Sequence, residues 1–236
     1  MVSPGCGHMT IVTSDTSDLV TWLAGCLGRG ESVPLPCADI AEFADHLTEQ
    51  SYAGGTMIYE RHAPPERVHI LRTGRVELTR DLGGRSAVLQ LLHPGSVFGD
   101  VAMFLRTGEP TGARAVEDCV VASIDSVVLF GLLGRRPLLA RRWLVSVAGR
   151  MAAMQDRVGD LLAGGLDRQV ASWLVREGTG AGIAVSQLTL ARLLGARRTS
   201  VNQSLRRLEA AGYITTGYRR IAVVDRPGLL DMMAGD

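Results

Sequence analysis

The residues whose types and spacing fit a definite chemistry lie near the C-terminal end of this 236-residue chain. In a helix over residues 198–210, Val201, Leu205 and Leu208 share one face, which we expect to be buried. The opposite face carries Arg198, Thr199, Ser200, Asn202, Gln203 and Arg206. Arginine recognises guanine, asparagine and glutamine recognise adenine, and threonine contacts the thymine methyl group or a phosphate. This face therefore has the composition of a helix that reads base edges in the major groove of double-stranded DNA.

The neighbouring elements are those that would hold such a helix against DNA. Ser186 is a suitable N-cap for a preceding helix, whose predicted buried face consists of Leu188, Leu190, Leu193 and Leu194. Gly195 supplies a sharp turn, and residues 213–224 have the pattern of a basic hairpin. Two short helices, a tight turn and a hairpin are the layout of a winged helix-turn-helix. The arginines expected to face phosphates are Arg197, Arg207, Arg219 and Arg220.

Charge is unevenly distributed along the chain. Residues 166–236 carry ten arginines against six acidic residues, a balance of +4, and the rest of the chain has a balance of −3. The C-terminal part is thus the better ligand for a polyanion such as DNA.

Several classes of protein are disfavoured. No segment approaches the roughly 18 uncharged apolar residues of a membrane span, and the start of the chain lacks the pattern of a secretory signal. We therefore expect no membrane partner and a cytoplasmic location, with reduced thiols at Cys6, Cys26, Cys37 and Cys119. No nucleophile accompanies a base and no residues show metal-ligand spacing, so we expect neither an enzyme nor a metal site.

The first half of the chain has the pattern of β-structure. Apolar runs between Tyr52 and Asp125 are separated by glycine and proline pairs, which predicts a small antiparallel barrel or sandwich. After Pro137 a long helical pattern runs to about residue 162. Its apolar residues have the spacing of a coiled-coil seam: Leu144, Val147, Met151, Met154, Val158 and Leu161. This seam predicts a homodimer, although a helix of this kind can also pack only against its own domain.

The order of these parts resembles the CRP/FNR family of bacterial transcription regulators. The resemblance runs from about residue 33 to 225 and rests on the segments GSVFGD and LTLARLLGARRTSVNQSLRRLEAAGYI. It implies an α+β chain: an N-terminal extension at 1–32, a cyclic-nucleotide-binding-like β-roll (a jelly roll) at 33–134, a dimerisation helix at 135–163 and a winged helix-turn-helix at 164–236. The implied function is sequence-specific transcription regulation by a homodimer on a near-palindromic operator, with RNA polymerase as a partner.

The reading helix departs from the pattern of the family it resembles, which is usually Arg-Glu-Thr-Val-x-Arg. Arg198 and Val201 are kept, whereas Thr199, Ser200 and Gln203 replace the Glu, the Thr and the second Arg. We therefore expect an operator that differs from the usual TGTGA half-site. It should keep a guanine for Arg198 and have a relaxed or A/T-leaning preference opposite Thr199 and Gln203.

The nucleotide pocket implied by the resemblance matches only in part. Gly99-Asp100 stands where the family has a Gly-Glu that takes the ribose hydroxyl. Glu109-Pro110 stands where the family has an Arg-Ser that holds the cyclic phosphate. An anion in place of a cation opposes binding of a charged phosphate.

Three other residues could contribute to an effector pocket. Arg106 or Arg114 would substitute for the missing cation from a rearranged loop, and Gln155 would offer an amide to adenine. Even so, we expect cAMP to be a weak, altered or vestigial cofactor.

Two other kinds of sensor depend on cysteine residues. Cys119 is a candidate redox thiol, although the adjacent Glu117 and Asp118 would raise its pKa. Cys6, Cys26 and Cys37 are too widely spaced for the iron–sulfur cluster of another branch of the family. The alternative function is an effector-binding module, for a cyclic nucleotide or redox signal, that does not act through DNA; the arginine-rich helix and hairpin favour the DNA-binding regulator.

Overall fold

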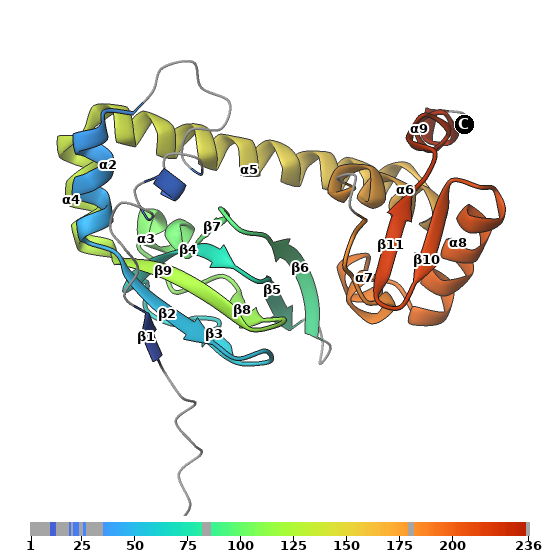
Figure 1. Ribbon diagram of the computed structural model, residues 1–236, viewed down its shortest axis with the longest axis horizontal. Coiled ribbons are helices and arrows are strands. Elements are labelled where there is room, and N and C mark those ends of the chain that lie inside the picture. Colours follow the sequence, from blue (N-terminus) through green and yellow to red (C-terminus); the bar gives the residue numbers. More distant parts are fainter. Residues whose placement is uncertain are drawn as a thin grey trace, which may run out of the picture. The chain divides into compact units, whose positions relative to one another are not determined.

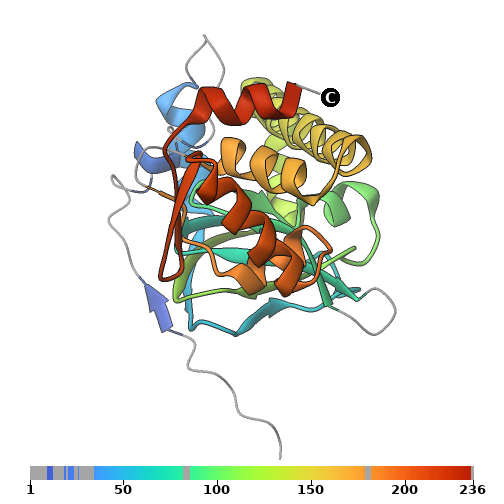
Figure 2. The ribbon, with the colours of Figure 1, turned by 90° about the vertical axis from the view of Figure 1, so that its right-hand side faces the viewer.

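The computed structural model describes residues 10–12, 19, 21–23, 26, 35–81, 86–178 and 182–234. The chain forms two compact units, one of residues 1–84 and 89–149 and the other of residues 85–88 and 150–236. The division falls within the long helix α5 (Pro137–Ala163), whose presence confirms the helical pattern predicted after Pro137. Figures 1 and 2 show the strands of the first unit in blue to green, and the helices and hairpin of the second in orange and red.

The first unit is built on two β-sheets. One sheet has the order β1 (Thr10–Val12), β2 (Thr48–Tyr52), β9 (Cys119–Asp125), β4 (Arg67–Thr73) and β7 (Val97–Phe98). The other has the order β3 (Met57–Tyr59), β8 (Gly112–Ala115), β5 (Val76–Asp81) and β6 (Ser86–Leu92). The described pairings between these strands are antiparallel, so the predicted antiparallel β-structure is confirmed as a jelly-roll-like fold.

Strand β4 is buried on both faces, which explains its nearly continuous apolar sequence. Leu71 belongs to a core cluster that includes Phe98 and Val121. Val68 and Ile70 belong to a second cluster, formed with the helices. These helices are α2 (Cys37–Asp45), α3 (Asp100–Leu105), α4 (Ser126–Arg135) and the beginning of α5.

Helix α4 begins directly after strand β9, where the sequence pattern predicted only the end of a strand. The carboxylate of Asp125 caps the helix by accepting hydrogen bonds from the backbone N–H groups of Val127 and Val128, at 2.8 and 3.1 Å. An aspartate at the end of a strand is thus also the N-cap of a helix.

Part of the predicted N-terminal extension belongs to the roll. Strand β1 pairs with β2 through Thr10↔Ser51 and Ile11↔Gln50. Leu19 and Leu23 are buried in the cluster that the helices form. The described part of residues 1–32 therefore contributes both a strand and core side chains.

The second unit contains the predicted winged helix-turn-helix. Its elements are α6 (Leu166–Glu177), α7 (Gln187–Leu193), α8 (Arg198–Ala210), β10 (Ile214–Gly217), β11 (Arg220–Val223) and α9 (Arg226–Ala234). Ser186 caps α7 by accepting a hydrogen bond from the N–H of Thr189 at 3.0 Å. Gly195 has φ +62°, which glycine adopts without steric cost, in the turn before α8. The prediction that Leu188 is buried is wrong, because its side chain lies 55% exposed on the solvent side of α7.

None of the helices in the described ranges is long and apolar enough to cross a membrane.

A buried hydrogen bond joins α3 to α5. The indole Nε1–H of Trp143 donates to Oδ2 of Asp100 at 3.0 Å, and the two residues are 2% and 1% exposed. The Trp143 ring also meets Phe43 of α2 edge-on, with ring centroids 6.0 Å apart. A bond to a charged group inside a core is strong, and loss of this donor removes part of the hydrogen bonding that stabilises the buried carboxylate.

We expect Trp143→Phe to lower the free energy of unfolding of the first unit by about 1–3 kcal/mol more than loss of core volume alone, because it removes the donor to Asp100. Urea denaturation followed by circular dichroism would measure this. Phe43→Leu is the matched control, since it removes apolar volume from the same core without unpairing a polar group. Equal destabilisation by the two substitutions would contradict the importance of the indole–carboxylate bond.

Candidate nucleic-acid interface and effector site

Helix α8 has the two faces that its sequence predicts. The inward side chains are at most 2% exposed: Val201, Leu205 and Leu208. Ser200 and Asn202 are half-buried, and four of the predicted reading residues are exposed: Arg198, Thr199, Gln203 and Arg206. The outward face of α8 is therefore available to a ligand.

Two polar contacts fix α8 in its unit. Arg207 forms a bidentate ion pair with Asp167 of α6, with N–O distances of 2.7 and 2.6 Å. This pair holds the pKa of Asp167 below its usual range. At the C-terminal end of α8, Glu209 accepts hydrogen bonds from the backbone N–H and the hydroxyl of Thr216, at 2.7 and 2.9 Å. The expectation that Arg207 faces a phosphate is corrected, because its guanidinium is held by Asp167.

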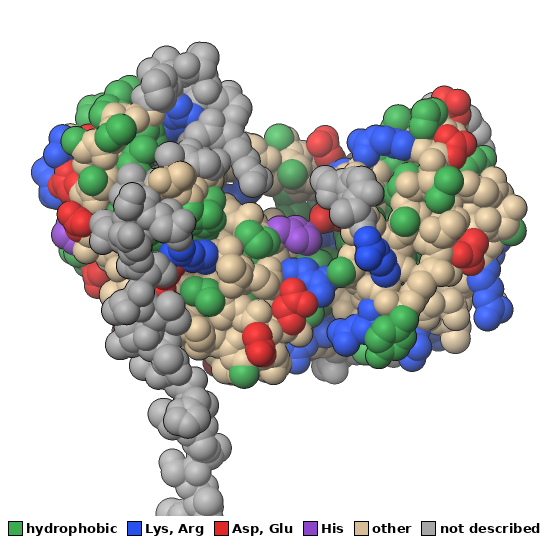
Figure 3. All heavy atoms as spheres, in the orientation of Figure 1, with side chains coloured by type: hydrophobic (Ala, Val, Ile, Leu, Met, Phe, Trp, Pro, Cys, Tyr) green, Lys and Arg blue, Asp and Glu red, His purple; other side chains and the backbone are tan. Residues whose placement is uncertain are grey.

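The hairpin of β10 and β11 carries exposed basic residues beside the reading helix. Arg219 and Arg220 are exposed, and Arg219 has φ +53° in the tight turn. A groove of about 410 Å³ is lined by Leu188 and Arg198 and by the hairpin residues from Thr216 to Ile221. Figure 3 shows basic side chains, in blue, on the visible face of this unit.

The same region contains one residue that sequence reasoning missed and one that it predicted to be buried. Tyr218, at the tip of the hairpin, is 94% exposed, and Leu188 lines the groove. The only signal for Tyr218 was its place between Gly217 and Arg219 in the predicted turn. Arg197 is exposed at the N-cap position of α8, where its side chain forms no capping hydrogen bond.

The predicted seam of α5 is largely uncovered. Its exposed fractions are 67% for Leu144, 62% for Met151, 43% for Met154 and 49% for Val158. Val147 differs, because it packs partly against the core of the first unit. The side chain of Leu161 lies outside the described residues.

Arg157 of α5 contacts the helix-turn-helix. Its guanidinium donates a hydrogen bond to the backbone carbonyl of Leu193 at the end of α7. Burial and the charge of Arg176 lower the pKa of Arg157. The C-terminal half of α5 is thus bonded to the helix-turn-helix within the second unit.

In the first unit, the segment that would hold a cyclic nucleotide packs against neighbouring core residues. Gly99 has φ +82°, and a Cβ atom there would lie 3.2 Å from the imidazole of His69. Asp100, expected to face a ribose, instead accepts the indole hydrogen bond of Trp143. The sequence predicts that Asp100 contacts an effector, whereas in the structure its carboxylate forms this hydrogen bond inside the protein.

Glu109 is buried inside the first unit, at 3% exposure. Burial, and then the charge of Asp100, raise the pKa of Glu109 to about 7. An acid in this setting is partly protonated near neutral pH, and when ionised it repels a phosphate.

An aromatic stack that sequence reasoning missed lies beside these acids. His69 stacks on Tyr59 and Phe98, with ring centroids 5.5 and 5.1 Å away. Its Nδ1 atom is 2.8 Å from the hydroxyl of Ser123, and burial lowers the pKa of His69 to about 4. The imidazole is therefore neutral at physiological pH and supplies no cation to the interior.

The remaining predicted pocket residues are Arg106, Arg114 and Gln155. Arg114 forms an ion pair with the buried Glu77 on the neighbouring strand β5, with Nε 2.7 Å from Oε1. Arg106 ends helix α3 with φ +53° and is exposed. Gln155 is exposed on α5. Within the first unit, Arg114 is therefore engaged on the sheet, whereas Arg106 lies exposed at the end of α3.

Cys119 lies in the core between the sheets, at 3% exposure. Burial, followed by the charges of Asp118 and Glu117, raises the pKa of its thiol to about 11. This is the environment of an unreactive structural cysteine rather than of a redox thiol. Cys6 lies outside the described residues, and among those described no group of three His, Cys, Asp or Glu residues could hold a metal ion.

Comparison with known proteins agrees with this architecture. Residues 49–136 match the family model of the cyclic nucleotide-binding domain, and residues 168–232 match that of the Crp-like helix-turn-helix domain. The chain is 24% identical to the CRP-like cAMP-activated global transcriptional regulator of Mycobacterium tuberculosis, over 79% of this chain and 88% of the other. The solved structure of FixK2 from Bradyrhizobium japonicum has a TM-score of 0.73 and 25% identity, over 80% of this chain and 98% of the other.

A more similar relative is the HTH-type transcriptional regulator Cmr of Mycobacterium tuberculosis. It is 37% identical over 208 residues, which are 88% of this chain and 85% of the relative. Identity at this level over most of both chains establishes common family membership. Together with the two matching domains, it shows that the chain belongs to the CRP/FNR family of transcription regulators.

Proposed function

We propose that the protein regulates transcription as a homodimer that binds a near-palindromic operator in double-stranded DNA. The observation that carries the proposal is the exposed polar face of α8, which begins with Arg198 at the groove that the basic hairpin also lines. Side chains from a helix and a wing can then contact a base and the adjoining phosphates at the same time. As in the family, RNA polymerase would be the further partner and the cytoplasm the site of action.

The reading face divides into residues for bases and residues for phosphates. We assign Arg198 to a guanine, and Asn202 and Gln203 to base edges of A·T pairs. Thr199, Ser200 and Arg206 would supply supporting contacts on the same face. The phosphate contacts would come from Arg197, Arg219 and Arg220, which are exposed at the start of α8 and on the hairpin.

The homodimer would form along α5. Leu144, Met151, Met154 and Val158 recur at spacings of three, four and seven residues, and each is at least 43% exposed. A helix that leaves such a stripe uncovered is stabilised by pairing with a second copy. Two reading heads joined in this way match the symmetry of a near-palindromic site.

Control by cAMP would be weak or altered in this protein. Glu109 occupies the loop where the family has a phosphate-binding arginine, and Asp100 is already bonded to Trp143. Arg114, one of the two candidate cations, forms an ion pair with Glu77. A nucleotide phosphate would meet an acid in place of a cation, which opposes binding.

We expect Arg198→Ala to weaken binding to the operator by about 5- to 150-fold, the equivalent of roughly 1–3 kcal/mol for a bidentate base contact. Affinity for an unrelated duplex should change much less. The operator would come from selection among randomised duplexes, with and without cAMP, and fluorescence anisotropy would give both affinities.

Arg219→Ala is the matched control, because it removes the same charge from a position assigned to a phosphate. It should weaken both duplexes to a similar extent and reduce the slope of log K against log salt by about 1. Unchanged operator affinity in Arg198→Ala would refute the assignment of α8 as the reading helix.

The seam generates a separate prediction. Met151→Asp should convert the dimer to a monomer of 25.2 kDa, because a carboxylate in an apolar seam loses its hydration without gaining a partner. Light scattering after size exclusion measures the mass. Ala152→Asp, at an exposed position one residue away from the seam, should leave the dimer intact. A wild-type protein that elutes as a monomer at micromolar concentration would exclude the proposed pairing.

The buried Glu109 predicts a dependence of stability on pH. Its pKa of about 7 in the folded protein exceeds the ordinary value of 4.5. The folded state therefore holds a proton that the unfolded state releases, and this residue reduces stability progressively as the pH rises from 4.5 to 7. Glu109→Gln stays neutral and avoids this loss.

The free energy of unfolding of Glu109→Gln, relative to wild type, should rise by on the order of 2 kcal/mol between pH 5 and pH 8. Urea denaturation at the two pH values would measure it. Glu66→Gln, which removes an exposed carboxyl group from the same unit, is the control. A Glu109→Gln difference that is the same at both pH values would show that the carboxyl group is not held as described.

A further inference from the structure

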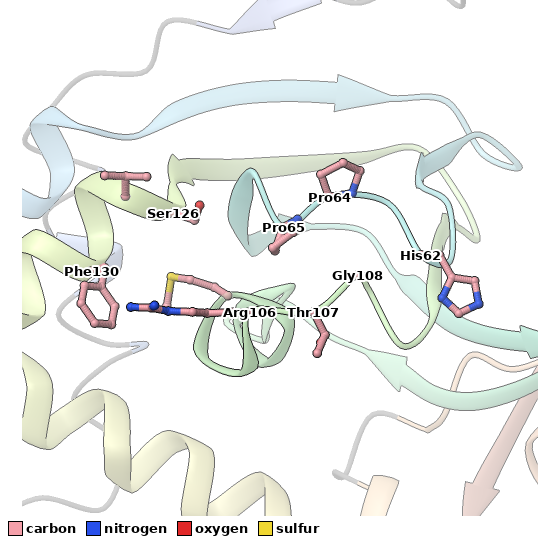
Figure 4. Close-up of a pocket in the computed structure, with 10 residues that line it drawn as sticks. His62, Pro64, Pro65, Arg106, Thr107, Gly108, Ser126 and Phe130 are labelled. Atoms are coloured by element: carbon pink, nitrogen blue, oxygen red, sulfur yellow. The ribbon is translucent and has the colours of Figure 1, made fainter.

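The first unit has a cavity that the proposed function does not use. A cavity of about 670 Å³ opens between the loop after β3, the end of α3 and the start of α4 (Figure 4). Its lining includes Pro65, Met103, Val127 and Phe130. This volume lies within the range of about 300–1,000 Å³ that small-molecule sites occupy.

Part of the cavity wall is apolar and exposed to solvent. Val127 is 79% exposed and Phe130 is 55% exposed, on the first turns of α4. Because these side chains gain stability when water is removed from them, they favour a ligand with an apolar body.

A single cation stands beside this apolar wall. Figure 4 shows the side chain of Arg106 extending toward Phe130. Within the described part of the chain, no carboxylate pairs with Arg106. The acid at the start of α4, Asp125, is bonded to the backbone N–H groups of Val127 and Val128. A guanidinium of this kind selects an anion such as a carboxylate.

The rim that carries Arg106 is held in a fixed conformation. The loop after β3 is tied to the loop after α3 by hydrogen bonds from His62 N–H to the Glu109 carbonyl and from Glu109 N–H to the Ala63 carbonyl, at 2.8 and 3.0 Å. His62 and Arg106 both have positive φ, at 68° and 53°, a conformation that costs about 1–2 kcal/mol for a non-glycine residue. Strain of this kind persists where surrounding contacts enforce it, and it gathers at ligand sites.

We propose that this cavity binds a small amphipathic carboxylate, with its apolar body against Val127 and Phe130 and its carboxylate on Arg106. One guanidinium balances a single negative charge, and the neighbouring Asp125 disfavours a dianion such as a phosphate monoester. The site is distinct from the nucleotide segment at Gly99–Asp100 and does not depend on DNA binding.

Calorimetric titration of the full-length protein with hexanoate, 1-hexanol and hexylamine tests the proposal, because the three probes share one chain length and differ in charge. Hexanoate should bind at least tenfold more tightly than 1-hexanol, and hexylamine more weakly than either. Arg106→Gln should weaken hexanoate binding at least tenfold and leave 1-hexanol unchanged. Arg80→Gln, which removes an exposed arginine elsewhere on the roll, is the matched control and should bind all three as wild type does.

Val127→Asp supplies a second test of location, since this exposed position tolerates a polar side chain and the added charge would repel the carboxylate. It should abolish hexanoate binding. The proposal is overturned by equal affinity for the three probes, by wild-type hexanoate binding in either Arg106→Gln or Val127→Asp, or by the absence of hexanoate binding, which is also the outcome if a second copy of the chain covers the cavity.

Discussion

The indole of Trp143 and the carboxylate of Asp100 form a buried hydrogen bond on which the arrangement of the first unit depends. Asp100 is the first residue of α3, directly after the left-handed Gly99, and Trp143 lies in the first half of α5. The bond therefore fixes the short helix that leads into the loop of Glu109 against the helix that continues into the second unit. A carboxylate used in this way has lost part of its capacity to bind a ribose, because one of its oxygens already accepts a charge-assisted bond.

The electrostatics of the interior of the roll depend on the position in which this hydrogen bond holds Asp100. Asp100 sits close enough to Glu109 to raise its pKa, and the adjacent His69 is kept neutral by burial. Burial and the nearby charge of Asp100 both favour the protonated form of Glu109 near neutral pH. A cyclic phosphate would favour a cation near this position, and the buried Glu109 is therefore the observation that supports our proposal of weak or altered control by cAMP.

In the second unit, charged residues divide between holding the reading helix and facing outward. Arg207 forms an ion pair with Asp167, and Glu209 accepts hydrogen bonds from the backbone N–H and hydroxyl of Thr216. Arg157 donates a hydrogen bond to the carbonyl of Leu193. These contacts fix α8, the wing and the end of α5 within one body. The backbone that presents the exposed Arg198 and its neighbours is then already ordered before a ligand binds, which reduces the entropic cost of binding.

Local signals in the sequence predicted what local chemistry decides: the bounds of α8, the Ser186 cap and the turn at Gly195 all depend on residues within one or two turns. Contacts between distant segments carry no such signal. In the sequence, Arg114 cannot be distinguished from an arginine that binds an effector. In the structure, the pairing of β8 with β5 brings it opposite Glu77, with which it forms an ion pair. The sequence predicts Arg106 as a substitute cation for a phosphate, whereas in the structure α3 ends at Arg106 in a left-handed conformation and its side chain lines the cavity beside α4. The residue at which a helix ends, and the surroundings of its side chain, depend on tertiary contacts that the spacing of residues does not encode.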